Sequence, residues 1–276
     1  MNGVVMPAIG FGVYQIPKED TKRCVLDALE VGYRSIDTAA AYFNEREVGE
    51  AIRESGLPRE SVFVTTKLWV QDYEYDDALR AVEKSLSELG LDTVDLVLLH
   101  KPYGNYYAAW RALERFYKEG RIRAIGVTSF SDERLQDLFL HDEVKPAVNQ
   151  IETHPFRQQQ KSNEFLKAEG IVHETWSPFA EGQKGIFTNP VLVRIAQAHG
   201  KSVAAVILRW LNQRGVVVIP KSVRRERMAE NLNILDFTLS PEEMGAIATL
   251  NEEKSPIYDE NDVATVRGIG LHKIHD

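Results

Sequence analysis

Four residues in the first hundred positions are of the types that could together donate a proton to a substrate: Asp37, Tyr42, Lys67 and His100. A phenol keeps its proton near neutral pH, because its reference pKa is about 10. An adjacent ammonium stabilises the phenolate left behind, so Lys67 would lower the pKa of Tyr42 and make it a better acid. Asp37 would keep Lys67 charged and in place. His100 could donate a hydrogen bond that orients a carbonyl oxygen.

Each of these residues also has a plainer interpretation. Lys67 follows the strand-like residues 62–66, and it could simply form a structural ion pair with Asp37. Tyr42 could be a packing or surface tyrosine, and His100 a histidine with satisfied hydrogen bonds. The proton-donating chemistry therefore depends on whether the fold brings the four side chains together.

The elements that must position them alternate between strand and helix. Apolar, β-branched runs predict eight strands, at 9–14, 34–37, 62–67, 94–100, 122–127, 147–151, 171–176 and 216–219. Helical spacing predicts helices at 21–31, 45–54, 75–89, 106–118, 131–140, 158–169, 190–199, 203–213 and 226–235, with a further helix start at 240–243. The tail from Lys254 is turn-rich and is expected to be short and irregular.

This alternation is typical of α/β proteins with parallel sheets. Eight units without a linker predict one (β/α)8 TIM-barrel domain spanning residues 1–276, with extra helices. An open doubly wound sheet is the alternative, but Gly10 and Gly12 begin a G-x-G-x-x-G motif that lacks its third glycine. In a barrel, strand ends share one face, and here they supply Asp37, Lys67, His100, Gln150, Trp176 and Lys221.

Composition narrows the class of partner and compartment. The net charge of −8 disfavours nucleic acid and anionic membrane surfaces as partners. The single cysteine, Cys24, excludes a disulfide within the chain and fits a reducing, cytoplasmic setting; it is a core filler or, alternatively, a reactive thiol. No signal peptide is evident, and no apolar stretch approaches the ~20 residues of a membrane span.

A basic run follows the last predicted strand, with Lys221, Ser222, Arg224 and Arg227 leading into the next helix. Helix N-termini favour phosphate through free N–H groups and the helix dipole, and arginine adds bidentate contacts. A solvated basic face is the alternative. Because the protein is acidic overall and this basic run would lie at a barrel mouth, a phosphate site is the favoured interpretation of the run.

The sequence resembles the aldo-keto reductase family, in the bacterial branch of 2,5-diketogluconate reductases and general carbonyl reductases. The resemblance spans nearly the whole chain in family order and is carried by residues 32–39 with Tyr42, 65–69, 95–100, 125–127, 149–155 and 219–227. It implies NADPH-dependent reduction of aldehydes or ketones by a monomer that binds no metal. Tyr42 would then be the acid of a tetrad with Asp37, Lys67 and His100.

The resemblance also implies binding roles for residues along the strand ends. Those expected to hold NADPH are Thr128, Ser129, Gln150, Trp176, Ser177, Pro178, Phe179, Lys221, Ser222, Val223, Arg224, Arg227, Glu230 and Asn231. Of these, Gln150 with residues 128 and 129 would hold the carboxamide, and Trp176 would stack on the nicotinamide. The substrate walls are expected to be Tyr14, Trp69 and Tyr103.

Some positions depart from the family pattern. Ser129 replaces an amide that usually binds the carboxamide, and Lys101 follows His100 where tryptophan is commoner. The N-terminal hairpin that closes the barrel bottom is expected to be short, and the short tail suggests an open, permissive pocket. Two other classes stay as alternatives: a non-catalytic NADP-binding subunit and a metal-dependent barrel hydrolase, although no His-x-His pair exists and Lys67 would repel a cation.

Overall fold

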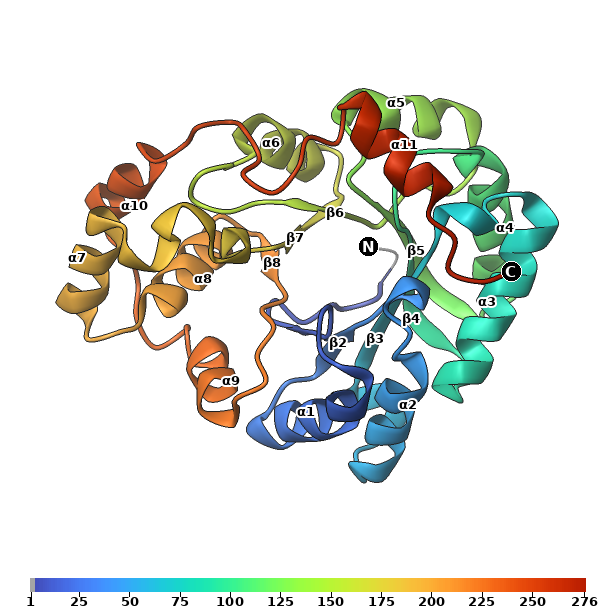
Figure 1. The fold of residues 1–276 in the computed structure, drawn as a ribbon, viewed down its shortest axis with the longest axis horizontal. Coiled ribbons are helices and arrows are strands. Elements are labelled where there is room, and N and C mark those ends of the chain that lie inside the picture. The colour runs from blue at the N-terminus through green and yellow to red at the C-terminus, as the bar shows by residue number, and fades with distance from the viewer. Residues whose placement is uncertain (1–2) are drawn as a thin grey trace.

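The computed structural model describes residues 3–276, in which eight parallel strands form a ring enclosed by helices (Figure 1). Each strand pairs with the next along the chain. The strands are β1 (Phe11–Gly12), β2 (Ser35–Asp37), β3 (Phe63–Leu68), β4 (Val94–Leu99), β5 (Ile122–Thr128), β6 (Val148–Glu152), β7 (Val172–Trp176) and β8 (Val217–Val218).

The sheet closes on itself between its last strand and the segment before β1. Gly10 N donates to Val218 O at 2.8 Å, and Val218 N donates to Ala8 O at 3.1 Å. Closure removes the open sheet edge that would expose unpaired backbone groups. The predicted (β/α)8 barrel is therefore confirmed, and the open doubly wound sheet is excluded.

Helices follow the strands at nearly all the predicted places. They are α1 (Lys18–Val31), α2 (Glu45–Glu54), α3 (Tyr75–Leu89), α4 (Tyr106–Lys118), α5 (Asp132–His141), α6 (Gln160–Ala168), α7 (Pro190–His199), α8 (Val203–Gln213), α9 (Arg225–Leu232), α10 (Pro241–Ala248) and α11 (Val263–Leu271). Short 3-10 segments are η1 (Ala40–Tyr42), η2 (Arg59–Ser61), η3 (Val70–Asp72) and η4 (Ala180–Thr188). The expectation of an irregular tail is wrong at α11, where the Asp262 side chain caps the helix by accepting from Thr265 N.

Alternation along the strands divides the barrel interior into an apolar floor and a polar upper part. The floor is a buried cluster of Phe63, Leu96, Leu98, Ala124 and Val148, with Val4 and Met6 packed against it. Side chains two and four positions further along the strands share the same inward face. Lys67 therefore lies above Phe63 on β3, and Gln150 lies above Val148 on β6.

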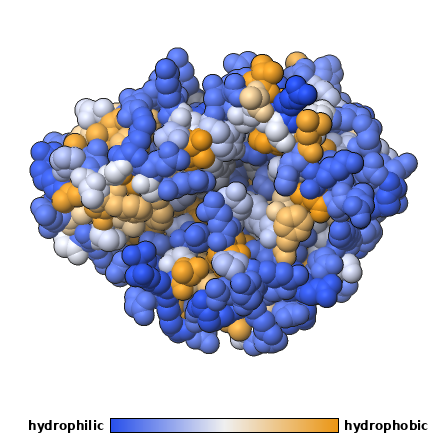
Figure 2. Space-filling model, viewed as in Figure 1, coloured by the Kyte–Doolittle hydropathy of each residue, from blue (hydrophilic) through white to orange (hydrophobic). Residues whose placement is uncertain are grey.

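The described N-terminal residues reach the barrel floor without a strand before β1. The tail crosses the opposite end, where α11 lies over the barrel rim near α4 and α5 (Figure 1). In the space-filling view the barrel mouth is a hollow surrounded by a largely hydrophilic face (Figure 2). Among the described residues no single helix is long and apolar enough to cross a membrane; α7 and α8 meet that test only as a pair bent by 91°.

Candidate active site

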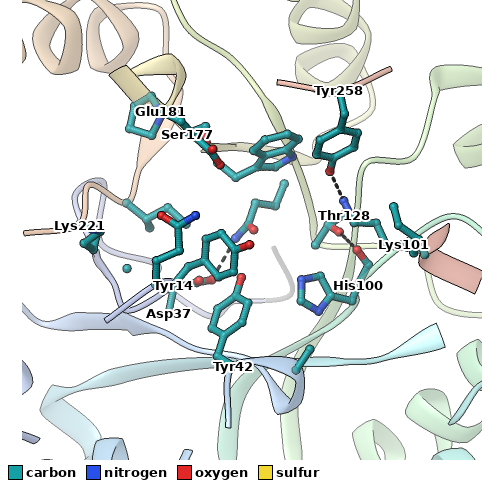
Figure 3. A pocket seen from close by; sticks show the side chains of 18 of the residues that line it. Tyr14, Asp37, Tyr42, His100, Lys101, Thr128, Ser177, Glu181, Lys221 and Tyr258 are labelled. Carbon is teal, nitrogen blue, oxygen red and sulfur yellow. Dashed lines mark hydrogen bonds between the residues drawn. The ribbon is translucent and has the colours of Figure 1, made fainter. Parts of the chain in front are cut away.

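The fold brings the four proton-handling side chains together at the barrel mouth. Lys67 Nζ lies 2.5 Å from Asp37 Oδ1, 3.0 Å from Thr38 O and 3.3 Å from the Tyr42 hydroxyl. The Tyr42 and His100 rings meet edge to face, with centroids 5.6 Å apart. Asp37 ends β2, Lys67 lies near the end of β3, and the Tyr42 hydroxyl reaches them from η1. Figure 3 shows Asp37, Tyr42 and His100 side by side in the cavity wall.

Burial and the ion pair act in opposite directions on Tyr42 and Lys67. Burial raises the pKa of Tyr42 to about 12, and the Lys67 charge lowers it by less than burial raises it. The net direction therefore differs from the lowered pKa expected from the sequence, although the effect of Lys67 itself has the expected sign. Burial opposes the charge on Lys67, but Asp37 and Tyr42 outweigh it and raise the pKa of that amine. Near neutral pH the site thus holds a protonated phenol beside an ammonium.

His100 is a neutral imidazole in this site. Burial, together with the charges of Lys67 and Lys101, lowers its pKa well below the ordinary value. Its Nδ1 is buried and has no hydrogen-bond partner among the described residues. Trp69 packs edge-on against the ring at 5.1 Å and fixes its orientation. A neutral imidazole carries one N–H, which it can donate to a carbonyl oxygen.

A carboxyl that the sequence analysis did not consider joins the same group from β7. Gln150 Nε2 donates to Asp37 Oδ2 at 3.0 Å and to Glu174 Oε2 at 2.7 Å. Glu174 is completely buried. The signal was present in the sequence, since period-two alternation along strand residues 171–176 puts Glu174 on the same face as Trp176.

A cavity of about 820 Å³ opens above the four side chains. Its lining includes half of the residues expected to hold NADPH, namely Thr128, Gln150, Trp176, Ser177, Pro178, Phe179 and Lys221. Ser129 lies beside it with a left-handed backbone (φ 59°) and a buried hydroxyl that has no partner among the described residues. The indole nitrogen of Trp176 is likewise buried and unpartnered. Unused donors of this kind fit a polar planar ligand.

The basic run lies at the start of α9, as expected. Arg225 is engaged by Asp27 and Glu30, at 3.2 and 2.6 Å. Arg224 and Arg227 form no ion pair within residues 3–276, and both are exposed. Ser222 Oγ accepts a hydrogen bond from Arg224 N at 3.1 Å and shapes the turn before the helix. Val223 and Glu230 are exposed beside this segment, whereas Asn231 is buried.

The expected substrate walls are only partly brought together. Tyr14 and Trp69 line the cavity. Tyr103 is not part of its lining, because its ring is buried and its hydroxyl donates to Glu260 O at 2.7 Å. The expected open pocket instead has a wall from the tail, which sequence reasoning missed. It includes Thr265, Gly268, Ile269 and His272.

Contacts beside the cavity help to tie the tail to the barrel. The Trp69 indole donates to His272 O at 2.8 Å. Lys101 Nζ donates to the Tyr258 hydroxyl at 2.5 Å, as drawn in Figure 3, and the Tyr258 ring stacks on Trp176 at 5.7 Å. Burial lowers the pKa of Lys101. Within residues 3–276, no cluster of three or more His, Cys, Asp or Glu is arranged to hold a metal ion.

Comparisons with known proteins agree with this architecture and site. A sequence model of the Aldo/keto reductase family matches residues 8–252. Glyoxal reductase of Bacillus subtilis (strain 168) is 48% identical over 255 residues, covering 92% of each chain. Methylglyoxal reductase of Escherichia coli (strain K12) is 43% identical over 256 residues, also covering 92% of each chain.

The same similarity extends to solved structures. The crystal structure of an aldo-keto reductase enzyme from a Medee basin deep-sea metagenome library matches with a TM-score of 0.92 and 41% identity, over 95% of this chain and 97% of that one. The chain belongs to the aldo/keto reductase family, and it is an oxidoreductase.

Proposed function

We propose that this enzyme reduces aldehydes and ketones to alcohols with NADPH, and that Tyr42 supplies the proton. The observation that carries the proposal is the Tyr42 hydroxyl, 3.3 Å from the Lys67 ammonium in the wall of a cavity large enough for a small organic substrate and a nicotinamide ring. A buried lysine held by a carboxylate at 2.5 Å is a fixed positive charge. Such a charge stabilises a phenolate as it forms.

The roles of the residues follow from their contacts. His100 and Tyr42 both line the cavity, where the imidazole N–H and the phenol O–H would orient the substrate oxygen. The bound cofactor would supply a hydride, which the protein cannot provide. As charge develops on the substrate oxygen, Tyr42 would release its proton to that oxygen. Lys67 would then hold the phenolate, and Asp37 would keep Lys67 in position.

Support for NADPH comes from the cations that remain unpaired at the start of α9. Lys221 reaches the cavity lining, and Arg224 and Arg227 stay free of carboxylates in the part of the chain that the structure describes. Exposed cations of this kind suit the 2′-phosphate that distinguishes NADPH from NADH. We further propose that the protein is a cytoplasmic monomer. The single cysteine of the sequence fits the reducing environment of the cytoplasm.

The experiment is NADPH oxidation by the purified enzyme with a panel of aldehydes, keto sugars and α-dicarbonyls. Glyoxal and methylglyoxal belong in it, since these are the substrates in the names of two relatives. Tyr42→Phe keeps the ring and removes only the acid, so kcat should fall about 10²–10⁴-fold. The Kd for NADPH, from nicotinamide fluorescence, should change little.

Two outcomes would contradict the proposal. If the wild-type protein binds NADPH tightly but does not oxidise it with any carbonyl compound of the panel, it would be a non-catalytic NADP-binding subunit. Turnover in Tyr42→Phe comparable to that of the wild type would remove Tyr42 from the role of acid.

A further inference from the structure

Glu174 is a buried carboxyl next to the proton-donating site, and the mechanism above gives it no role. It comes from β7, on the inward face, and it accepts a hydrogen bond from Gln150 Nε2 at 2.7 Å. The other hydrogen of the same amide goes to Asp37 Oδ2 at 3.0 Å. A continuous chain of contacts therefore runs from Glu174 through Gln150, Asp37 and Lys67 to Tyr42.

The charges along this chain do not balance if every carboxyl is ionised. Two carboxyls share one amide nitrogen, and within residues 3–276 the one cation that reaches them is Lys67, which is bound to Asp37. The register partner of Glu174 on β8 is Val217, so that side offers no charge. Glu174 Oε1 is buried and has no partner in residues 3–276. Two buried like charges this close disfavour ionisation of the less well paired one.

We propose that Glu174 is a positioning residue of this site: it keeps its proton at neutral pH, anchors Gln150, and leaves Asp37 as the one charged carboxylate beside Lys67. This inference rests on the proposed function, because the role concerns the acidity of Tyr42. The direction of the Glu174 titration agrees with it. Burial and the Asp37 charge raise the pKa of Glu174 to about 8.

A consequence for catalysis follows when Glu174 loses its proton. The new negative charge would stabilise the Lys67 ammonium but oppose formation of the Tyr42 phenolate nearby. Tyr42 would become a weaker acid while remaining protonated, since burial already holds its pKa near 12. The rate of carbonyl reduction should therefore fall to a lower plateau, and not to zero, as the pH rises through about 8.

The test compares kcat against pH for the wild type and Glu174→Gln, which keeps the shape and the acceptor oxygen for Gln150 but cannot ionise. The wild type should lose roughly three- to tenfold in kcat between about pH 7 and about pH 9.5. Glu174→Gln should match the wild type near pH 7 and show no such fall. Infrared spectra should show a protonated carboxyl in the wild type that titrates at the same pH and is absent from the variant.

Glu45→Gln is the matched control. Glu45 is another buried carboxyl, and burial raises its pKa as well. It accepts a hydrogen bond from the Thr66 hydroxyl at 2.6 Å, on the helix side of β3. This variant should keep the wild-type pH profile. If Glu174→Gln does not fold, Glu174→Met also removes the ionisable group, although it gives up the acceptor for Gln150, and its kcat should likewise show no fall as the pH rises.

The inference fails if Glu174→Gln retains the fall in kcat, or if the wild-type infrared band of a protonated carboxyl is missing near pH 7. A wild type that reduces no carbonyl compound would instead defeat the proposed function. The infrared titration needs no activity and would still decide the protonation of Glu174.

Discussion

Lys67→Met would remove the central cation of the site while keeping most of the apolar stem. Lys67 is 1% exposed, and its Nζ contacts Asp37 at 2.5 Å. Removing one partner of a buried ion pair typically costs about 3–5 kcal/mol, because the other charge stays buried without compensation. Asp37 keeps its hydrogen bond from Gln150, so we expect a loss near the lower end, about 3 kcal/mol in the free energy of unfolding.

A double-mutant cycle separates this charge effect from lost packing. In Asp37→Asn/Lys67→Met the orphaned charge is gone, so the double variant should be more stable than Lys67→Met alone. Urea unfolding measures the four free energies of the cycle. Lys22→Met is a control with the same 2.5 Å separation from a carboxylate, that of Glu54, but at the surface. Its stability should change little, because solvent screens exposed pairs.

The same variant tests the chemistry. Without the ammonium, nothing offsets the effect of burial on Tyr42, and kcat for carbonyl reduction should fall about 10²–10⁴-fold. Two results would refute the reasoning: near-normal turnover in Lys67→Met, or a double variant no more stable than the single one. The first would remove Lys67 from the mechanism, and the second would show that Asp37 carries no uncompensated charge.

Two further predictions concern the cofactor and the stability of the protein. Arg227→Ala should raise the KM for NADPH far more than that for NADH, since it would remove a contact to the 2′-phosphate; equal effects on both would contradict the phosphate assignment. Glu174→Gln should also change how stability depends on pH. The pKa of Glu174 is raised from 4.5 to about 8 on folding, so its contribution is fully present below about pH 4.5 and is lost as the pH rises to about 8. The variant should lack this loss, which is on the order of 5 kcal/mol in the free energy of unfolding from urea titrations at successive pH values. Parallel wild-type and Glu174→Gln curves would speak against a buried, protonated Glu174.

Much of the architecture could be predicted because its causes are local. Strand–helix alternation specifies the parallel barrel, and parallel strands bring their carboxyl ends to one rim. Asp37, Lys67 and His100 each stand at such an end, so their convergence followed from the fold class alone. The start of α10 was equally readable, since Ser240 and Glu243 form a reciprocal cap around Pro241.

The remaining features depend on contacts between distant parts of the chain. Tyr258 meets Lys101 across more than half of the sequence and also stacks on Trp176, and no pattern near Tyr258 indicates either contact. The α11 helix forms a cavity wall through contacts with distant residues, among them the bond from the Trp69 indole to the backbone of His272. The direction of the Tyr42 pKa shift could not be predicted from the sequence for a related reason. It depends on how deeply the hydroxyl is buried and on how far it lies from Lys67, and both are properties of the folded barrel.

The raised pKa of Tyr42 keeps the hydroxyl protonated at rest, although it also makes the resting phenol a weaker acid. A phenol with a pKa of about 12 is protonated throughout the physiological range, so the proton is present whenever a carbonyl compound binds. The Lys67 charge need not free that proton in the resting enzyme. It needs to act when the proton begins to leave the hydroxyl and negative charge builds up on the phenol oxygen, and a buried, immobile ammonium acts most strongly at that moment because solvent does not screen it. Keeping Glu174 neutral serves the same end, since a second buried carboxylate would cancel part of the field that Lys67 supplies.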